Sequence, residues 1–334
     1  MRVLGAAEIR ALAPMPSLIE ALREAFRNPP TSPGRQVAPV PGGRGDRLLL
    51  YMPAFDAAGG GAVKLATVFP DNGERGLPTI QAALVVFSDT GTPVALLDGA
   101  MVTRLRTSAA SALASTYLSR ADSAHLLIIG TGALAPYMAL AHCTVRPIRL
   151  VTVSGRREER ARQTAAEIRS LVGAKVEVEV ASCPDNIAPA ADIISCATSS
   201  ARPVLAGKWL RPGTFVDLVG SFSPARREAD DEAVLRSRIF VDTFEGALSE
   251  AGDLLDPMAR GLIGRDCIEG GLADLVSGRS TGRRGATEII LFKSVGSAIE
   301  DLAAAKLIVT SALGASSQWT SGDTPQRSLR RGSP

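Results

Sequence analysis

Residues 125–157, HLLIIGTGALAPYMALAHCTVRPIRLVTVSGRR, decide the fold of this chain. His125–Ile129 is a short, uninterrupted apolar run, which is typical of a parallel strand buried on both faces. Glycines follow directly, and the residues after them predict a helix over Ala133–Ala141 and a second strand over Leu150–Val153. Strand, glycine turn, helix and strand in this order form half of a dinucleotide-binding unit.

The turn at residues 130–135 reads GTGALA, a GxGxxA pattern. Gly130 permits a sharp turn, Gly132 lets a pyrophosphate approach the backbone, and Ala135 stands where helix and strand pack closely. A GxGxxA pattern alone also occurs in ordinary α/β units, but the flanking elements favour a nucleotide site. The turn residues that we expect to line the cofactor are Gly130, Thr131, Gly132, Ala133 and Leu134.

The second strand is followed by Ser154, Gly155, Arg156 and Arg157. An NAD-specific site usually presents Asp or Glu to the ribose 2′-hydroxyl here, whereas in this chain the first carboxylate after the second strand is Glu158. Two guanidinium groups suit a 2′-phosphate by charge and by geometry. The segment predicts NADP(H) rather than NAD(H), with surface arginines at a helix start as the alternative.

The composition of the chain limits the classes of protein to which it can belong. The chain has 334 residues, 46% of them hydrophobic, and a net charge of +3, which favours neither nucleic acid nor a membrane as a partner. We find no signal peptide and no apolar run of about 18 residues, so we expect a cytoplasmic protein. The cysteines lack CxxC spacing and there are only two histidines, so no zinc set is expected. The cysteines are Cys143, Cys183, Cys196 and Cys267.

The first third of the chain precedes the nucleotide motif and predicts a separate unit. Residues 6–27 have helical periodicity, which ends at Pro29 and Pro30, and Met101–Leu118 reads as a helix of small residues. Turn residues separate four expected strands, which an antiparallel sheet would accommodate. The strands are Arg47–Pro53, Gly61–Phe69, Thr79–Phe87 and Pro93–Asp98.

Three cations in this unit lie among apolar or small residues. Lys64 is inside the strand GAVKLATVF, where a buried ammonium needs an anionic partner. Arg106 is on the small-residue helix and could bind a carboxylate with two hydrogen bonds. Arg35 lies in the loop before the first strand. The alternative for each is a solvated or internally paired cation.

The rest of the chain continues the α/β pattern. Residues 158–172 predict a helix, and residues 288–305 predict a strand or extended segment that leads to a helix. Ala197 and Thr198 end a strand where small residues can line a cofactor cleft, and Asp217 and Asp242 also lie near strand ends. The expected strands are Lys175–Val180, Ala191–Ala197, Phe215–Val219 and Ile239–Asp242.

The segments GAVKLATVFPDN, LLDGAMVTRLRTSAASALAS, IIGTGALA, ADIISCAT, DLVGSFSPARREAD and TEIILFKSVGSAIEDLAAA resemble, in this order, the ornithine cyclodeaminase/μ-crystallin family. The resemblance implies a substrate-binding and dimerisation domain over residues 1–120 and 297–334, and an NAD(P)-binding Rossmann domain over 121–296. It implies that Arg35, Lys64 and Arg106 contact a substrate carboxylate. It also implies cofactor contacts at Thr107, Val219, Gly220, Ser221, Lys293 and Ser294. The last twenty residues read as a loose tail.

Two positions depart from the family pattern. Leu134 replaces a frequent glutamine, and Phe222 stands where ornithine cyclodeaminases have an aspartate. A phenyl ring cannot serve as a base for amine chemistry. The VGSFSPARRE segment is more similar to that of the family's reductases of Δ1-pyrroline-2-carboxylate and Δ1-piperideine-2-carboxylate. Together with the arginines after the second strand, these features predict NADPH-dependent reduction of a cyclic ketimine acid, and the resemblance implies a homodimer.

In the expected reaction the three cations hold the substrate carboxylate, and hydride reaches C2 to give L-proline or L-pipecolate. Lys64 is the candidate proton donor, although an imine that arrives protonated needs none. The alternatives are an NAD-dependent ornithine cyclodeaminase or alanine-type dehydrogenase, and a non-catalytic protein that binds NADPH and a small ligand.

Overall fold

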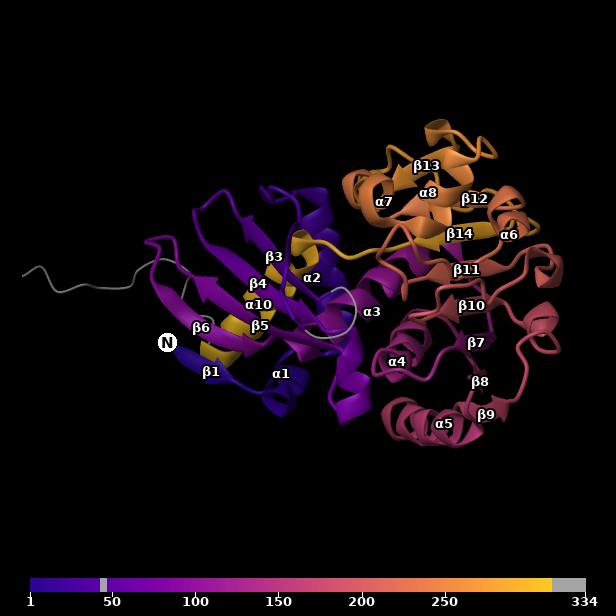
Figure 1. The fold of residues 1–334 in the computed structure, drawn as a ribbon, viewed down its shortest axis with the longest axis horizontal. Helices are drawn as coiled ribbons and strands as arrows, with labels where there is room; N and C mark the ends of the chain where they lie inside the picture. Colours follow the sequence, from indigo (N-terminus) through magenta and orange to yellow (C-terminus); the bar gives the residue numbers. More distant parts are fainter. Residues whose placement is uncertain (43–46, 314–334) are drawn as a thin grey trace, which may run out of the picture.

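The chain folds around two β-sheets that lie side by side (Figure 1). A computed structural model describes residues 1–42 and 47–313. Six strands from residues 2–98 form one sheet, and eight strands from residues 125–293 form the other. The predicted α/β class is confirmed, while the division into two domains at the stated boundaries stays a prediction.

The eight-stranded sheet is parallel throughout. Its order is β13-β12-β14-β11-β10-β7-β8-β9, in which β9-β8-β7-β10-β11 is the 3-2-1-4-5 arrangement of a dinucleotide-binding sheet. Every residue of β10 and β11 is buried, as expected of apolar strands covered on both faces. The strands are β7 (His125–Ile129), β8 (Leu150–Ser154), β9 (Glu177–Ala181), β10 (Ile193–Cys196), β11 (Phe215–Leu218), β12 (Arg238–Val241), β13 (Ile268–Gly271) and β14 (Ile290–Lys293).

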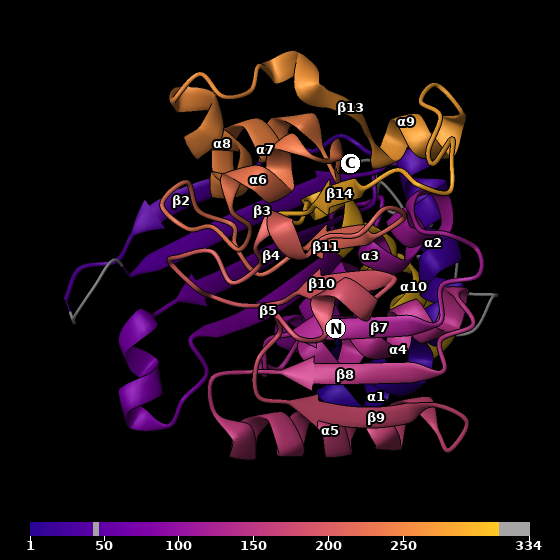
Figure 2. The same ribbon diagram turned by 90° about the vertical axis from the view of Figure 1, so that its right-hand side faces the viewer.

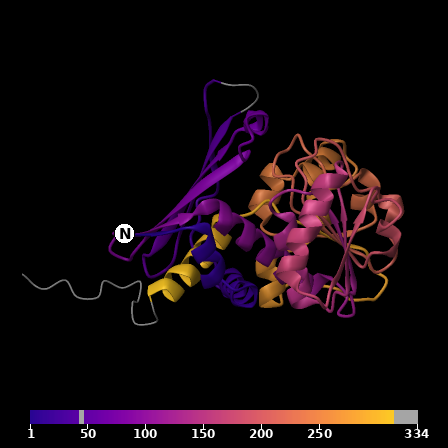
Figure 3. The same cartoon turned by 90° about the horizontal axis from the view of Figure 1, so that it is seen from below.

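Helices cover both faces of this sheet, as the view from below shows (Figure 3). One face packs against α3 (Gly99–Leu118), α4 (Ala135–Val145) and α5 (Glu158–Val172). Apolar residues of α6 (Asp231–Leu235), α7 (Phe244–Glu250) and α8 (Gly252–Ala259) cover the other. The shorter helices are α9 (Leu272–Ser277) and the 3-10 segments Pro70–Arg75, Ala188–Ala190, Gly207–Trp209 and Arg265–Cys267.

The six-stranded sheet has the order β1-β6-β5-β4-β3-β2, antiparallel except for the β1/β6 pair. Helix α3 packs on β5, and α10 (Ala298–Leu313) packs on β3 and β4. The end of the described chain thus returns to the first sheet, as expected (Figure 1). The strands are β1 (Arg2–Leu4), β2 (Gln36–Pro39), β3 (Leu48–Phe55), β4 (Gly61–Val68), β5 (Ile80–Phe87) and β6 (Pro93–Asp98).

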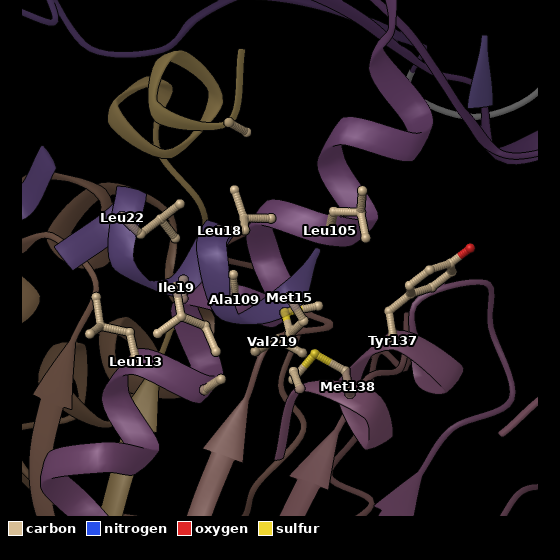
Figure 4. Close-up of a cluster of buried hydrophobic side chains, with 14 of the residues drawn as sticks. Met15, Leu18, Ile19, Leu22, Leu105, Ala109, Leu113, Tyr137, Met138 and Val219 are labelled. Atoms are coloured by element: carbon tan, nitrogen blue, oxygen red, sulfur yellow. The ribbon is translucent and has the colours of Figure 1, made fainter. Parts of the chain in front are cut away.

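A shared apolar cluster joins the two halves (Figure 4). Leu18 and Leu22 of α2 (Met15–Arg27), Leu113 of α3 and Met138 of α4 are all fully buried there. Helix α3 packs on both α2 and α4, so it belongs to the cores of both halves. Because protein interiors are close-packed, this cluster fixes one sheet relative to the other.

The structure corrects the sequence prediction for two helices. The helix expected over residues 6–27 is divided into α1 (Ala6–Leu12) and α2, because Pro14 lacks an amide proton and its ring would clash with the preceding turn. The helix expected over Ala133–Ala141 begins two residues later, at Ala135, and continues four residues further, to Val145. The predicted strands agree with the observed ones to within two residues, and the predicted loose tail lies outside the described residues.

Candidate active site

The glycine turn stands at the carboxyl end of β7. Gly130 has a φ of 130°, and a Cβ there would lie 2.5 Å from the Ala197 carbonyl oxygen, so the turn requires glycine. Gly132 and Ala133 are exposed just before α4 begins. A Cβ on Gly132 would have its nearest neighbour, again the Ala197 oxygen, at 4.0 Å. The turn is therefore open to a ligand at the N-terminus of a helix, and it fits the pyrophosphate of a dinucleotide.

The strand ends beside this turn carry the other residues expected at the cofactor. The β7, β8 and β10 strands lie side by side (Figure 2); Ser154 is the last residue of β8, and Thr198 follows β10. Val219, Gly220 and Ser221 follow β11 in the same parallel sheet. The carboxyl ends of these strands form one edge, where a dinucleotide binds in folds of this class.

Arg156 and Arg157 are exposed immediately after β8. Among the described residues, neither side chain has a hydrogen bond or an ion pair. Arg157 occupies the N-cap position of α5, whose first turn contains Glu158 and Glu159. Both guanidinium groups are thus available to an anionic ligand at the end of the second strand.

The structure brings the three predicted cations together. Lys64 on β4 and Arg106 on α3 are 2% and 4% exposed, and both bind the carboxylate of Asp301 on α10. The distances to Oδ1 are 2.9 Å from Lys64 Nζ and 3.0 Å from Arg106 Nε. Arg106 also donates to Glu300 Oε2 at 2.7 Å. The internal pairing considered as an alternative therefore exists, and we refer to Lys64, Arg106, Glu300 and Asp301 as the buried ion cluster.

Burial and charge shift the proton affinities in this cluster. Burial and the nearby charge of Arg106 lower the pKa of Lys64 to about 8, against the pull of Asp301. Burial raises the pKa of Glu300 to about 7, although Arg106 opposes it. Burial alone would also raise the pKa of Asp301. The positive charges of Lys64 and Arg106 outweigh this effect, so the pKa of Asp301 is lowered. Asp301 is thus the stable anion, while Lys64 and Glu300 titrate near neutral pH.

Arg35 reaches the same region from the loop before β2. Its Nη2 donates to the carbonyl oxygens of Val295 and Gly296, each at 3.0 Å, and its Nη1 pairs with Glu250 on α7. Its Nε is buried and has no hydrogen-bond partner. Its charge also acts on both Lys64 and Asp301. Arg35 therefore joins the substrate-side loop to the end of β14 and adds a third positive charge beside the buried ion cluster.

The segment after β14 is shaped by Asp242. Its Oδ2 accepts bonds from Ser294 Oγ at 3.0 Å and from the amides of Val295 and Gly296 at 2.8 and 2.6 Å. Gly296 has a φ of 81°, and a Cβ there would lie 2.3 Å from Arg106 Nη1. The backbone thus lies directly against the guanidinium group, which places the buried ion cluster at the carboxyl end of β14.

The side chain of Lys293 points elsewhere. It is fully buried, and its Nζ lies 2.9 Å from Asp253 Oδ2. Its ammonium group is therefore committed to the protein interior, and only its backbone remains for the predicted cofactor contact. Thr107 is 7% exposed beside Arg106, and Phe222 packs partly buried against the apolar cluster of the parallel sheet.

Sequence reasoning missed the carboxylates of the site. Glu300 and Asp301 lie in a segment that resembles the family, but the motif does not identify them as partners of Lys64 and Arg106. Two adjacent acids in the otherwise apolar stretch AIEDLAAA are the available signal, because buried cations require buried anions. Glu228 and Glu250 offer no comparable signal, because Glu228 lies in a polar stretch and each of the two is a single acid with no pattern around it.

Within residues 1–42 and 47–313, no helix is long and apolar enough to cross a membrane. The same ranges contain no group of three or more His, Cys, Asp or Glu residues arranged to hold a metal ion.

Comparison with known proteins agrees with the motifs. The model of the ornithine cyclodeaminase/mu-crystallin family matches residues 1–316. The Δ1-pyrroline-2-carboxylate reductase of Colwellia psychrerythraea is 39% identical over 321 residues, which cover 92% of this chain and 98% of that protein. The Thermococcus litoralis Δ1-pyrroline-2-carboxylate reductase in complex with NADH and L-proline has a TM-score of 0.89 and 35% identity, covering 94% of this chain and 98% of that one. An archaeal alanine dehydrogenase dimer with bound NAD has a TM-score of 0.83 and 29% identity, with coverage of 94% and 96%. This chain therefore belongs to the ornithine cyclodeaminase/mu-crystallin family.

Proposed function

We propose that this chain reduces the C=N bond of a cyclic ketimine acid, Δ1-pyrroline-2-carboxylate or Δ1-piperideine-2-carboxylate, to L-proline or L-pipecolate with NADPH. The family match and the reductase relatives assign the general class, an NAD(P)H-dependent oxidoreductase that acts on C=N. The ring size of the substrate and the choice of NADPH are the finer parts of the proposal.

A surplus of hydrogen-bond donors around Asp301 supports the carboxylate site. Arg35 Nε is buried without a partner, and no described residue accepts from Arg106 Nη2. Lys64 has three donors and binds only the Asp301 carboxylate. A buried donor without an acceptor is costly, and Arg35 Nε is such a donor; together with the spare donors of Arg106 and Lys64 it suits a ligand that brings its own carboxylate.

The position of these donors suits hydride transfer. The buried ion cluster lies at the carboxyl end of β14, and the glycine turn lies at the carboxyl end of β7 in the same parallel sheet. When bound, the reduced nicotinamide supplies a hydride to the substrate. Arg35, Lys64 and Arg106 would hold the substrate carboxylate and so orient C2, the carbon that accepts the hydride.

The proton belongs on the imine nitrogen. A protonated imine accepts hydride at C2 and keeps its proton, so a substrate that arrives protonated needs no acid from the protein. Lys64 is the candidate donor when it does not, because its lowered pKa of about 8 makes proton release easier. Phe222 has no ionisable group, which weighs against the cyclodeaminase alternative.

Arg156 and Arg157 support the choice of NADPH. They are exposed and unpaired among the described residues, at the position where a 2′-phosphate would lie. The T. litoralis reductase structure contains NADH, so the preference is a property to be measured on this chain.

The first experiment measures oxidation of NADPH and of NADH with Δ1-pyrroline-2-carboxylate and with Δ1-piperideine-2-carboxylate. We expect turnover, with NADPH the better cofactor, and we expect an R156A/R157A double variant to lose that preference while it keeps NADH turnover. The matched control is R162A, because Arg162 is a 72% exposed cation on the same helix.

A parallel assay supplies ornithine and NAD in place of the imine and the reduced cofactor. Release of ammonia from ornithine, without imine reduction, would overturn the reductase proposal in favour of a cyclodeaminase. Oxidation of alanine would support a dehydrogenase, and tight binding of NADPH and imine without turnover would support a binding protein.

Lys64 should give carboxylate binding a pH dependence. Lys64 loses its charge as the pH rises through its lowered pKa of about 8, so inhibition by L-proline should weaken above that pH. Lys64→Arg keeps its charge over this range and should not show the loss, whereas Lys64→Met should bind weakly at every pH. Equal pH profiles for all three proteins would contradict the assignment, and full turnover by Lys64→Met would exclude Lys64 as the proton donor.

Gly296→Ala should damage the substrate site. A Cβ at this position would meet Arg106 Nη1 at 2.3 Å, so the guanidinium group must move. We expect kcat/KM for the imine to fall by about tenfold or more, which corresponds to about 1.4 kcal/mol. Gly261→Ala is the control, because Gly261 also has a positive φ, 71°, but nothing lies within 4 Å of its added Cβ. An equal fall in kcat/KM in both variants would mean that the loss comes from placing alanine at a positive φ and not from the contact with Arg106.

The outer face of the six-stranded sheet supports a homodimer. A row in register across five strands is apolar throughout, and none of its members is buried. Leu65 on the same face is 38% exposed, whereas α3 and α10 cover the other face. The members of the row are Val3, Leu96, Val85, Val63 and Pro53. A second copy of the chain is the proposed occupant, because a large uncovered apolar face is typical of an interface and the related alanine dehydrogenase is a dimer.

Sedimentation should find a dimer that Leu65→Asp converts to monomer. The buried carboxylate would have no partner at a self-complementary interface, so association should weaken by at least a hundredfold. Leu262→Asp is the control, because Leu262 is 42% exposed on the parallel-sheet half. A wild-type monomer, or a Leu65→Asp dimer as tight as the wild type, would overturn the proposed face.

A further inference from the structure

Glu228 lies at the centre of a buried network behind the cofactor edge. It is fully buried between β11 and α6, and both of its carboxylate oxygens accept bonds. Oε1 accepts from the amide and the hydroxyl of Thr198, at 2.7 and 2.9 Å. Oε2 accepts from the amides of Gly220 and Ser221, at 2.7 and 3.2 Å. One side chain therefore binds both loops, the one after β10 and the one after β11.

The two loops are in close contact as well as bonded to Glu228. A Cβ on Gly220 would lie 2.1 Å from both the amide nitrogen and the carbonyl oxygen of Thr198. The Ala197 carbonyl in turn lies against Gly130 of the glycine turn. The ends of β7, β10 and β11 thus form one connected edge. The carboxylate oxygens of Glu228 accept hydrogen bonds from the backbone amides of this edge that point into the protein.

Further charges hold Glu228 itself in place. Asp253 Oδ1 accepts from the amides of Glu228 and Ala229 at 2.7 and 3.0 Å. Asp253 also pairs with Lys293 at the end of β14, the strand that leads to the Arg106 contact. The network therefore runs without interruption from the cofactor loops to the substrate end of β14.

We propose that Glu228 is a positioning residue that sets the spacing of the two strand-end loops and so the depth at which the nicotinamide half of the cofactor sits. The inference rests on the proposed function, because it assumes that a nicotinamide dinucleotide occupies this edge. Glu228 is fully buried behind the loops and does not itself touch the cofactor or the substrate. It acts through Thr198, Gly220 and Ser221.

The ionised carboxylate is the form that can accept all four bonds. The charged and titratable groups that face it are Lys293, which favours the ionised form, and Asp253 and Cys196. Burial outweighs Lys293 and raises the pKa of Glu228 to about 7. Protonation turns one acceptor oxygen into a donor opposite an amide, so cofactor binding should weaken as the pH falls below about 7.

The test compares Glu228→Gln with Glu232→Gln, which makes the same chemical change at an exposed carboxylate of the neighbouring helix α6. The glutamine amide would oppose a backbone N–H of one loop, a clash of two donors. We expect the dissociation constant of NADH, followed by its fluorescence, to rise about tenfold in Glu228→Gln at pH 8 and to stay unchanged in Glu232→Gln. NADH is the probe because it lacks the 2′-phosphate, which titrates in the same range.

The wild-type titration separates the possible failures. Wild-type binding should weaken below about pH 7, and Glu228→Gln should show no such dependence. If the wild type binds no nicotinamide at any pH, the proposed function fails; if wild type and Glu228→Gln bind alike, only this inference fails. If Glu228→Gln does not fold, hydrogen exchange of the wild-type amides of Thr198, Gly220 and Ser221 decides, because the proposal requires all three to lose protection together as the pH falls. Independent exchange of these amides would overturn it.

Discussion

The carboxylate of Asp301 is the interaction on which the rest of the structure depends. It neutralises Lys64 from a β-strand and Arg106 from a helix, and it comes from a third element near the end of the described chain. Removing one partner of a buried pair leaves an uncompensated charge, which typically costs about 3–5 kcal/mol. The packing of β4, α3 and α10 is therefore also the condition under which these buried charges are matched.

The arrangement gives the two halves different tasks. The parallel sheet provides a rigid edge at which backbone amides and glycines leave room for a dinucleotide. The antiparallel sheet provides Lys64 on its covered face, α3 adds Arg106, and α10 brings the carboxylates that pair with both cations. Arg35 and Gly296 join these parts, because the guanidinium of Arg35 binds the backbone just after β14. The chemistry of the family is thus built from main-chain geometry on one side and side-chain charge on the other.

Much of this could be predicted from the sequence. Apolar runs, glycines and turn residues indicated most strands, and the isolation of Lys64 and Arg106 in apolar surroundings indicated buried cations. Three short edge strands, β1, β2 and β13, and the small helices after β11 were not predicted, because segments of so few residues have no clear periodicity. Glu228 and Glu250 were missed for a different reason. Their importance lies in contacts with segments distant in the chain, and a single sequence does not record such contacts.

The return of α10 to the first sheet affects how the protein can fold during its synthesis. During synthesis, β4 and α3 leave the ribosome long before Asp301 and Glu300 exist. Until then Lys64 and Arg106 have no counter-charge, and burying them would be strongly unfavourable. Lys64 and Arg106 can therefore be buried with matched charges only after α10 has been made. A chain cut before α10 would lack both the helix and the carboxylates that pair with these cations.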